Sequence, residues 1–485
     1  MTKELRRLSM LVLAMFLALF VSTSVIQVVQ ADDLSANPLN RRALYDTFEV
    51  QRGAIIASGA AIAASVPTDD LYSWQRVYTD PYMWAPVTGF INPVLGSATG
   101  MERAMNQELS GTADSQFLAR IEQIISGQQP RGSNVVLTLD AAAQRAAFEA
   151  LGDLQGAVVA IEPATGRILA MVSSPSYDTN LLAVHDAAAV EATEAALLDD
   201  PLQPLDNRAI AGRLNPPGST FKLVVASAAL STGEWTAQST LPNPAAYTLP
   251  QSSSIVRNAG GGTCGPGEEV TIADALRLSC NIPFAELAVR LGDDVIRDEA
   301  EKFGFDSSFT MPLESTPSVY PTVLDDAQTA LSGFGQGDVR ATPLQMAMVS
   351  AGIAHQGVVM NPRMVEAIIA ADFTQQQSFD DTEYGRAVSE EVAASMTRMM
   401  VANVQTGIAS GATIDGVDVA GKTGTAENGV DDPYTLWFTG FAPADDPRVA
   451  VAVVVENGGG LGQSGSSNRI AAPIAAKVME AVLSR

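Results

Sequence analysis

The chain has 485 residues, more than one typical domain contains, and 47% of them are hydrophobic, enough to bury large cores. Its formal net charge is −25 at pH 7, with 54 acidic and 29 basic residues. An acidic surface repels phosphate, so nucleic acid is a poor candidate partner, and we interpret the charge as a solvated surface.

The first predicted element is an apolar N-terminal helix. No charged residue occurs between Arg7 and Asp32, and basic residues precede this stretch. It is long enough to span a bilayer, and its basic flank predicts a cytoplasmic N-terminus. We therefore expect a cytoplasmic tail at residues 1–7, a single transmembrane anchor at 8–31 and an extracytoplasmic remainder. A cleaved signal peptide is the alternative, because residues 29–31, Val-Gln-Ala, fit a cleavage site.

Residues 32–132 are predicted to form a small separate domain. Their sequence alternates short strand-like pieces with breaks, as in YTDPYMWAPVTGFINPVLGS. The polar stretch SGQQPRGSN, at residues 126–134, contains glycine and proline and is typical of a domain boundary. A larger domain is then expected over residues 133–485.

The larger domain begins with a predicted strand at 134–140, followed by a helix over AAAQRAAFEALGDL and a β-hairpin over GAVVAIEPATGRILAMVSSPS. Residues from about 185 to 420 are expected to be mainly helical and loop-like. Near the end, TLWFTGFAP and RVAVAVVVENG are predicted strands, and RIAAPIAAKVMEAVLSR is a predicted closing helix. Strands at both ends around a helical middle predict an α+β domain whose antiparallel sheet is built from distant segments.

The segment LNPPGSTFKLVVASAAL, residues 214–230, predicts a turn that opens a helix, because proline is excluded from helix interiors and glycine permits a sharp turn. Ser219 then lies in the first helical turn, with Lys222 three residues later on the same face. Free backbone N–H groups at a helix start favour developing negative charge. Taken alone, the pair is either a nucleophile with its base or an ordinary helix start.

Two further polar clusters follow in the sequence. Ser279 and Asn281 form an S-x-N triplet within RLSCNIPFAEL. Residues 422–425 form K-T-G-T within the strand-like GVDVAGKTGTA, where Gly424 permits close approach of a ligand backbone. The joint occurrence of S-x-x-K, S-x-N and K-T-G-T in this order is very improbable by chance.

The lysines suit activation of a serine. A serine hydroxyl is a poor nucleophile until a neighbouring base removes its proton, and Lys222 is a base only when neutral. If folding brings the motifs together, burial and a second cation, Lys422, would both lower the pKa of Lys222. The two histidines, His185 and His355, lie far from the motifs in sequence, so we expect structural or surface positions for them and no Ser-His-Asp triad.

The three motifs resemble those of the penicillin-binding proteins and serine β-lactamases. The sequence is more similar to the class B penicillin-binding proteins, which are monofunctional transpeptidases with a membrane anchor and a pedestal domain. RGAIIA, NRAI and GFGQGDVRATPLQMAMVSAGIAHQG also fit, and YDTFEVQRGAI with NPPGSTFK is most similar to the actinobacterial penicillin-binding protein A subgroup. The pedestal departs from many class B members, because RGAIIASGAAIA lacks their acidic-Arg-Asn-Gly stretch.

The resemblance covers nearly the whole chain and implies a penicillin-binding transpeptidase fold. That fold has an antiparallel sheet flanked by helices and an all-helical subdomain. The implied roles are Ser219 as the nucleophile that attacks a D-Ala-D-Ala carbonyl, and Lys222 as its base. Ser279 would relay a proton to the leaving amine, and Asn281 would hold Lys222 and the substrate amide.

The resemblance also assigns the K-T-G-T segment to substrate binding. Lys422 would supply positive potential, and the hydroxyls of Thr423 and Thr425 would bind the terminal carboxylate beside Gly424. Backbone N–H groups of Ser219 and Thr425 would form the oxyanion hole. The implied chemistry needs no metal or cofactor.

The two cysteines, Cys264 and Cys280, are either joined in an extracytoplasmic disulfide or are two separate buried thiols. We favour the disulfide, although sequence alone does not show that the two residues come close enough. Without a C-x-x-C pair or a Cys/His cluster, the sequence does not predict a zinc site.

The function implied by the resemblance is a β-lactam-inhibited peptidoglycan D,D-transpeptidase that cross-links stem peptides during cell division or in setting cell shape. The alternatives are a D,D-carboxypeptidase, a β-lactamase or a non-catalytic β-lactam-binding wall scaffold. An E-x-x-x-N segment of the kind that deacylates class A β-lactamases is not found at the expected place. Because no glycosyltransferase region precedes the transpeptidase region, we expect a SEDS-type glycosyltransferase and division or elongation proteins as partners.

Overall fold

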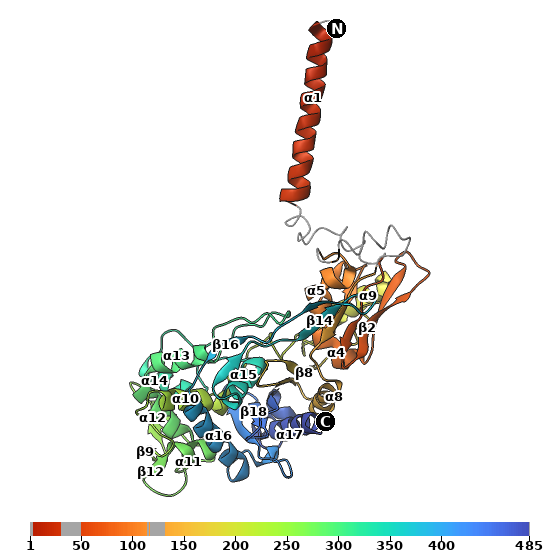
Figure 1. The fold of residues 1–485 in the computed structure, drawn as a ribbon. Helices are drawn as coiled ribbons and strands as arrows, with labels where there is room; N and C mark the ends of the chain where they lie inside the picture. The colour runs from red at the N-terminus through yellow and green to blue at the C-terminus, as the bar shows by residue number, and fades with distance from the viewer. Residues whose placement is uncertain (1–2, 31–49, 114–115, 117–130, 485) are drawn as a thin grey trace.

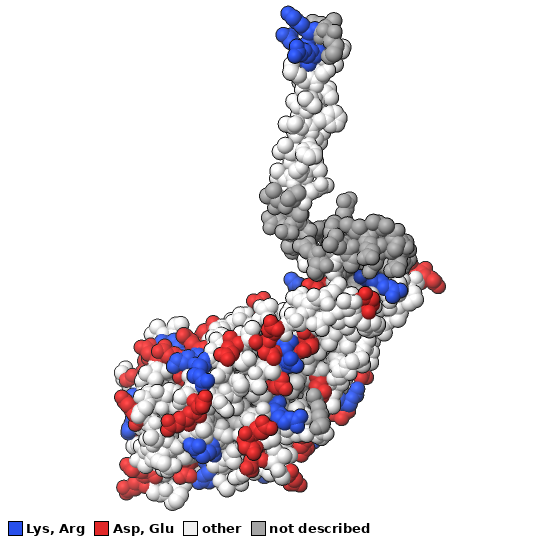
Figure 2. Space-filling view, viewed as in Figure 1, with Lys and Arg blue, Asp and Glu red and all other residues white. Residues whose placement is uncertain are grey.

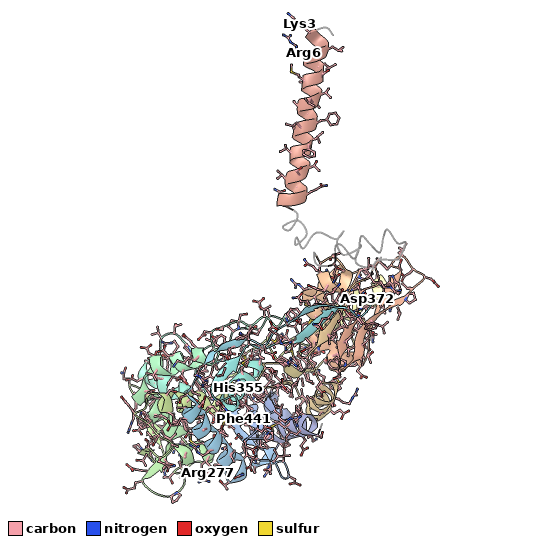
Figure 3. All side chains as sticks on the ribbon, viewed as in Figure 1. Lys3, Arg6, Arg277, His355, Asp372 and Phe441 are labelled. Carbon is pink, nitrogen blue, oxygen red and sulfur yellow. A yellow bond between two sulfur atoms is a disulfide. The ribbon has the colours of Figure 1, made fainter. Side chains whose placement is uncertain are left out.

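The computed structural model describes residues 3–30, 50–113, 116 and 131–484 (Figure 1). Its first element is helix α1 (Lys3–Ser24), which continues into the short π-helix η1 (Val25–Val29). The segment Leu5–Gln27 is long and apolar enough to cross a membrane, and none of it is buried in the protein. Basic side chains gather at the outer end of α1 (Figure 2), where Lys3 and Arg6 are labelled in Figure 3.

A six-stranded sheet forms the pedestal at the end of the body that lies nearer α1 in Figure 1. Its order is β15-β14-β6-β1-β2-β3. The strands are β1 (Ile55–Ala57), β2 (Ala60–Pro67), β3 (Trp74–Tyr78), β6 (Asn134–Leu137), β14 (Val365–Ile369) and β15 (Gln375–Ser378). Three of the six strands, β6, β14 and β15, come from beyond residue 132. The pedestal sheet therefore contains strands from both sides of the predicted boundary between residues 132 and 133.

Small elements complete the pedestal beside this sheet. They are α4 (Pro81–Thr88), β4 (Ile91–Asn92), β5 (Ser97–Ala98), α5 (Gly100–Ala104) and α6 (Asn106–Ser110). Inside, Glu102 accepts hydrogen bonds from Arg52 at 2.9 Å and from Arg76 at 2.5 Å. Burial opposes the charge of Glu102, yet the two guanidinium groups hold its pKa below the ordinary value. The ion cluster is therefore a structural centre of the pedestal.

The second sheet has five antiparallel strands in the order β17-β18-β19-β7-β8. They are β7 (Gly156–Ile161), β8 (Ile168–Ser174), β17 (Ala420–Ala426), β18 (Thr435–Ala442) and β19 (Val449–Val455). β7 and β8 form the predicted hairpin, and β18 and β19 are the strands predicted near the end of the chain. This confirms the prediction of an antiparallel sheet built from distant segments of the chain.

Helices cover both faces of the five-stranded sheet. α8 (Ala141–Leu151) and α17 (Ala471–Leu483) pack together on one face, and α15 (Pro343–Ala354) lies on the other. Alternate residues of one strand therefore enter different cores: Val158 packs with α8 and α17, whereas Val159 packs in the larger core with α15. This two-sided burial explains why the strands read as nearly continuous apolar runs.

A group of helices lies at the end of the molecule opposite the pedestal (Figure 1). It contains α10 (Lys222–Ser231), α11 (Ile272–Arg277), α12 (Asn281–Leu291), α13 (Asp293–Lys302) and α14 (Asp326–Ser332). α16 (Glu390–Gln405) connects this group to the sheet, since it packs on β17 as well as on α10 and α11. The expected helical subdomain is present, but it is not all-helical, because residues 240–271 between α10 and α11 form two short two-stranded ladders beside it.

The expectation that residues 185–420 are mainly helical and loop-like was wrong in part. Besides α9 (Ala187–Asp199), the region contains β14 and β15 of the pedestal sheet. It also contributes short two-stranded ladders, made of β9 (Thr240–Pro242), β10 (Tyr247–Thr248), β11 (Ile255–Val256), β12 (Glu269–Thr271), β13 (Val358–Met360) and β16 (Glu383–Arg386). The hairpin tip between β14 and β15 carries Asp372, which Figure 3 labels in the pedestal.

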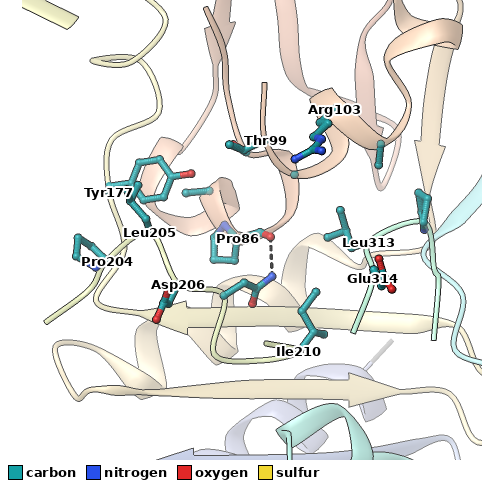
Figure 4. A pocket seen from close by; sticks show the side chains of 16 residues that line it. Pro86, Thr99, Arg103, Tyr177, Pro204, Leu205, Asp206, Ile210, Leu313 and Glu314 are labelled. Atoms are coloured by element: carbon teal, nitrogen blue, oxygen red, sulfur yellow. Dashed lines mark hydrogen bonds between the residues drawn. The ribbon is translucent and has the colours of Figure 1, made fainter. Parts of the chain in front are cut away.

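A cavity of about 460 Å³ lies where the pedestal meets the segment 204–210 (Figure 4). Arg103 and Tyr177 face it from one side, and Asp206 and Glu314 line it from the other. Asn207 Nδ2 donates across the junction to the carbonyl oxygen of Pro86 at 2.8 Å. The cavity lies apart from the motif residues, none of which is among the described residues that line it.

Candidate active site

Ser219 lies in a 3₁₀ turn, η3 (Gly218–Thr220), directly before α10. Thr220 Oγ1 donates to the carbonyl oxygen of Pro217 at 2.6 Å and closes this turn. The indole Nε1 of Trp437 donates to Pro216 O at 2.9 Å, so the turn is also tied to β18. The prolines and the glycine thus present Ser219 at the start of a buried helix, as the sequence predicted.

The Ser219 turn and β17 approach each other through two glycines. Gly218 has φ +53°, and a Cβ there would lie 2.7 Å from the backbone oxygen of Thr425. A Cβ on Gly424 would lie 2.8 Å from the backbone oxygen of Pro217. Because both contacts are with backbone atoms that cannot move aside, only glycine permits this approach.

Lys222 is fully buried and has three oxygen neighbours. Its Nζ donates to the backbone oxygen of Ser279 at 2.8 Å and to Asn281 Oδ1 at 2.9 Å. The third neighbour is Ser219 Oγ at 3.0 Å. A neutral amine has two N–H groups, which the two carbonyl oxygens use, so its lone pair is left to accept the proton of Ser219.

The electrostatic surroundings favour that neutral form. Burial, followed by the positive charge of Lys422, lowers the pKa of Lys222 well below its ordinary value. Burial also lowers the pKa of Lys422, to about 7. The positive charge at neutral pH therefore rests more easily on Lys422 than on Lys222, which separates a base from a cation in one pocket.

Ser279 lies between the two lysines. Its φ is +57°, an uncommon conformation for a residue with a side chain. In this conformation its backbone oxygen accepts from Lys222, while its Oγ accepts from Lys422 Nζ at 2.5 Å. Lys422 also donates to the backbone oxygen of Thr423 at 2.8 Å. The Ser279 hydroxyl thus joins Lys422 to the cleft, which Ser279 lines.

Asn281 begins α12, and a residue that sequence analysis missed holds it there. Asn258 Oδ1 accepts from the backbone N–H groups of Asn281 at 2.9 Å and of Ile282 at 3.0 Å. This contact satisfies N–H groups that helix starts leave unpaired. The residue between Ser279 and Asn281 is Cys280, which is disulfide-bonded to Cys264 with their Cα atoms 5.8 Å apart. The S-x-N motif is thus fixed from both sides.

The K-T-G-T threonines differ in their contacts. The buried Oγ1 of Thr423 has no hydrogen-bond partner in the described part of the chain. Thr425 Oγ1 lies 2.9 Å from Ser467 Oγ, and Ser467 Oγ donates to the backbone oxygen of Gly424 at 2.5 Å. Because the single proton of Ser467 is used in that bond, Thr425 donates to Ser467. Ser467 was also missed: it is 42 residues from Thr425 in sequence and belongs to no local pattern.

A cleft of about 1,320 Å³ opens over these groups. Ser219, Ser279, Asn281, Thr423 and Thr425 line it. Its charged lining residues are Arg213, Arg257, Arg340, Glu427, Asp432 and Glu456. The structure thus places the three predicted motifs around one cavity, and the two histidines are not among the residues that line it.

Two protein families match the sequence. Residues 156–480 match the penicillin binding protein transpeptidase domain, and residues 52–135 match the penicillin binding protein A dimerisation domain. The peptidoglycan D,D-transpeptidase PbpA of Mycolicibacterium smegmatis is 43% identical, across 100% of this chain and 99% of that protein. The protein of the same name from Mycobacterium tuberculosis is 41% identical, with the same shares covered.

Solved structures give the same result. The ceftriaxone acyl-enzyme of penicillin-binding protein A from M. tuberculosis superposes with a TM-score of 0.87 at 40% identity, covering 90% of this chain and 100% of that one. The penicillin G acyl-enzyme of the same protein gives a TM-score of 0.85 at 40% identity, with the same shares covered. The resemblance noted from the motifs therefore extends to the fold of both the pedestal and the larger domain.

Proposed function

This chain belongs to the penicillin-binding protein transpeptidase family, and on that premise we propose that Ser219 is the nucleophile of its peptidoglycan D,D-transpeptidase reaction and Lys222 the base. The observation that carries the proposal is the hydrogen bonding of Lys222. Its two carbonyl contacts orient the lone pair of the neutral amine toward Ser219 Oγ, 3.0 Å away.

In the acylation step, Lys222 takes the proton of Ser219 while Oγ attacks the carbonyl carbon of the penultimate D-Ala. The N–H groups of Ser219 and Thr425 stabilise the oxyanion. The bond to the terminal D-Ala then breaks, and the leaving nitrogen receives a proton through Ser279, whose hydroxyl contacts Lys422 at 2.5 Å. An amine of a second stem peptide then attacks the ester and forms the cross-link. Its proton passes through Ser279 to Lys422, which supplied the proton of the leaving nitrogen, while Lys222 returns its proton to Ser219 Oγ, so both lysines end as they began.

The terminal carboxylate of the donor is assigned to the Lys422 end of the cleft. Lys422 supplies the positive charge, and the unpartnered hydroxyl of Thr423 is a free donor for a carboxylate oxygen. Thr425 takes part after its hydroxyl turns from Ser467 toward the ligand. Asn281 holds Lys222 and contributes its amide to the donor peptide. The carboxylate of a β-lactam is expected to use the same groups.

Product analysis distinguishes a transpeptidase from a carboxypeptidase. The full chain in detergent is incubated with a stem peptide ending in D-Ala-D-Ala and an amine acceptor, and the products are separated by liquid chromatography with mass detection. We expect a cross-linked product that has lost one D-Ala, absent with Ser219→Ala. A product that has only lost D-Ala, with no acceptor attached, would make the chain a carboxypeptidase.

The N-terminal helix supports a membrane-anchored arrangement. We propose that residues 1–7 lie in the cytoplasm and 8–31 span the membrane, because basic residues gather at the outer end of α1 (Figure 2). The parts outside the membrane are then a pedestal at 32–132 and a transpeptidase domain at 133–485. Class B penicillin-binding proteins, which the motifs resemble, usually work with a SEDS-type glycosyltransferase and with division or elongation proteins, so these are the proposed partners.

A further inference from the structure

Strand β17 is the edge strand of the five-stranded sheet, and its outer edge faces the cleft. On this edge the backbone oxygen of Thr423 contacts Lys422, and the backbone oxygen of Thr425 lies against the Gly218 turn. Backbone groups of alternate residues point to the same side of a strand. Glu427, one residue beyond the strand, therefore presents its N–H and C=O as the next pairing position along the same edge.

The side chain of Gln336 occupies that position. In the orientation of its amide that satisfies both groups, the nitrogen donates to the backbone oxygen of Glu427 at 3.2 Å. The amide oxygen accepts from the Glu427 N–H at 2.9 Å. Such a two-bond exchange is what a hydrogen-bonded residue of a neighbouring antiparallel strand makes. Gln336 thus takes the place of one residue of an added strand.

The backbone around Gln336 is fixed to the Ser219 turn. Gly218 N donates to the backbone oxygen of Gly335 at 3.0 Å, and a Cβ on Gly335 would lie 2.0 Å from Gly218 O. The N–H of Gln336 donates to Leu331 O at 3.1 Å. Gln336 is therefore held at a constant position relative to Ser219, and is half-buried in the wall of the cleft.

An extended donor peptide would pair with β17 as an additional antiparallel strand. When the carboxylate of the donor peptide lies at Lys422 and Thr423, the N-terminal part of the donor runs toward Glu427. Thr425 offers the first pairing position for the donor, and Glu427 would offer the second. Because Gln336 already fills the second position, the added strand ends there.

We propose that Gln336 is a specificity-determining residue that ends the substrate-binding edge of β17. The D-Ala-D-Ala end pairs with the strand, and the residue before it turns away from the edge at Gln336. That third residue of the donor is consequently recognised through its side chain in the cleft and not through strand pairing. The proposal rests on the function proposed above. It adds that only the D-Ala-D-Ala end of the donor is bound as a strand.

The test compares two thioester donors that end in D-alanyl-thiolactate, one capped with acetyl and one extended by a third, diamino acid residue. The ratio of their second-order acylation rate constants, extended over short, is measured for the full chain in detergent. Gln336→Ala should raise this ratio about tenfold, because two backbone groups become free to pair with the longer donor. Gln336→Glu should give an intermediate ratio, since a carboxylate still accepts from the Glu427 N–H but cannot donate to its C=O.

The matched control is Gln405→Ala, which removes an exposed glutamine outside the cleft whose amide donates to Asp418 Oδ1. Its ratio should stay as in the wild type. An unchanged or lower ratio in Gln336→Ala, or loss of acylation by both donors in both Gln336 variants, would overturn the proposal. If wild-type protein is acylated by neither donor and not by benzylpenicillin, the proposed function itself fails, which is a separate outcome.

Discussion

The proposed mechanism gives opposite tasks to two amines of one buried pocket, Lys222 and Lys422. Burial lowers the pKa of both amines. The pKa of Lys222 is lowered further by the positive charge of Lys422. Lys222 must be neutral to accept the proton of Ser219, whereas Lys422 must be charged to attract the donor carboxylate. Acylation therefore requires a pH at which these two conditions hold together.

The sign of the pH dependence follows from these shifts. As the pH rises, Lys222 loses its proton first and the second-order rate constant for acylation by benzylpenicillin increases. The rate constant falls again as Lys422 deprotonates. The descending limb of the pH profile is expected near the pKa of Lys422 in the free protein, which is about 7. Lys422→Arg, whose guanidinium stays charged, should lack this descending limb even if its maximum is lower. A descending limb that persists unchanged in Lys422→Arg would assign it to another group.

Ser467 is a positioning residue for Thr425. Its Oγ donates to Gly424 O and accepts from the Thr425 hydroxyl, so it fixes the K-T-G-T backbone and one threonine rotamer. Ser467→Ala should slow acylation by benzylpenicillin roughly tenfold, because it removes one or two hydrogen bonds between uncharged groups. Ser466→Ala, at the neighbouring and less buried position, is the control. Equal rates in both variants would remove Ser467 from the site.

At the scale of elements, α12 depends on a side chain from outside its own sequence. Asn258 Oδ1 accepts from two N–H groups at the start of α12, where Asn281 contacts the base Lys222. Asn258→Ala should lower the free energy of unfolding by about 1–2 kcal/mol and slow acylation as well. Urea unfolding and acylation rates check the two effects. Normal acylation in a destabilised variant would show that Asn281 keeps its place without this cap.

The elements that the sequence predicted are those with a local signal. The β7–β8 hairpin, β18, β19 and α17 are apolar runs, and each motif occupies four residues or fewer. β14 was missed because its partner strand, β6, is far away in the sequence. Next to this strand pair, Thr138 donates a hydrogen bond to the backbone oxygen of Met364, 226 residues later. Asn258 and Ser467 were missed for the same physical reason, since each acts only through a partner that folding brings near.

At the scale of the molecule, the pedestal and the transpeptidase domain share a sheet. β1 pairs in parallel with β6, and β14 pairs with the other side of β6. The pedestal sheet is therefore continuous with the segments that lead to β7 and away from α15. A loss of pedestal stability should accordingly be felt by the chain as a whole and not by its first 132 residues alone.

Glu102 tests this coupling. Glu102→Ala leaves Arg52 and Arg76 buried without their carboxylate and should lower the free energy of unfolding by roughly 3–5 kcal/mol. Glu149→Ala, which removes an exposed carboxylate of α8, should change it by less than about 0.5 kcal/mol. Urea unfolding followed by tryptophan fluorescence provides the comparison. Similar midpoints for the two variants would mean that the buried ion cluster does not support the pedestal.

The central claim is that Ser219, activated by Lys222, forms a covalent acyl-enzyme. Its most direct test is the intact mass of the full chain after incubation with benzylpenicillin, followed over hours beside Ser219→Ala. The account predicts one long-lived adduct of a single drug molecule in the wild type and none in the variant. An adduct that forms equally in Ser219→Ala, or no adduct at any dose, would contradict it.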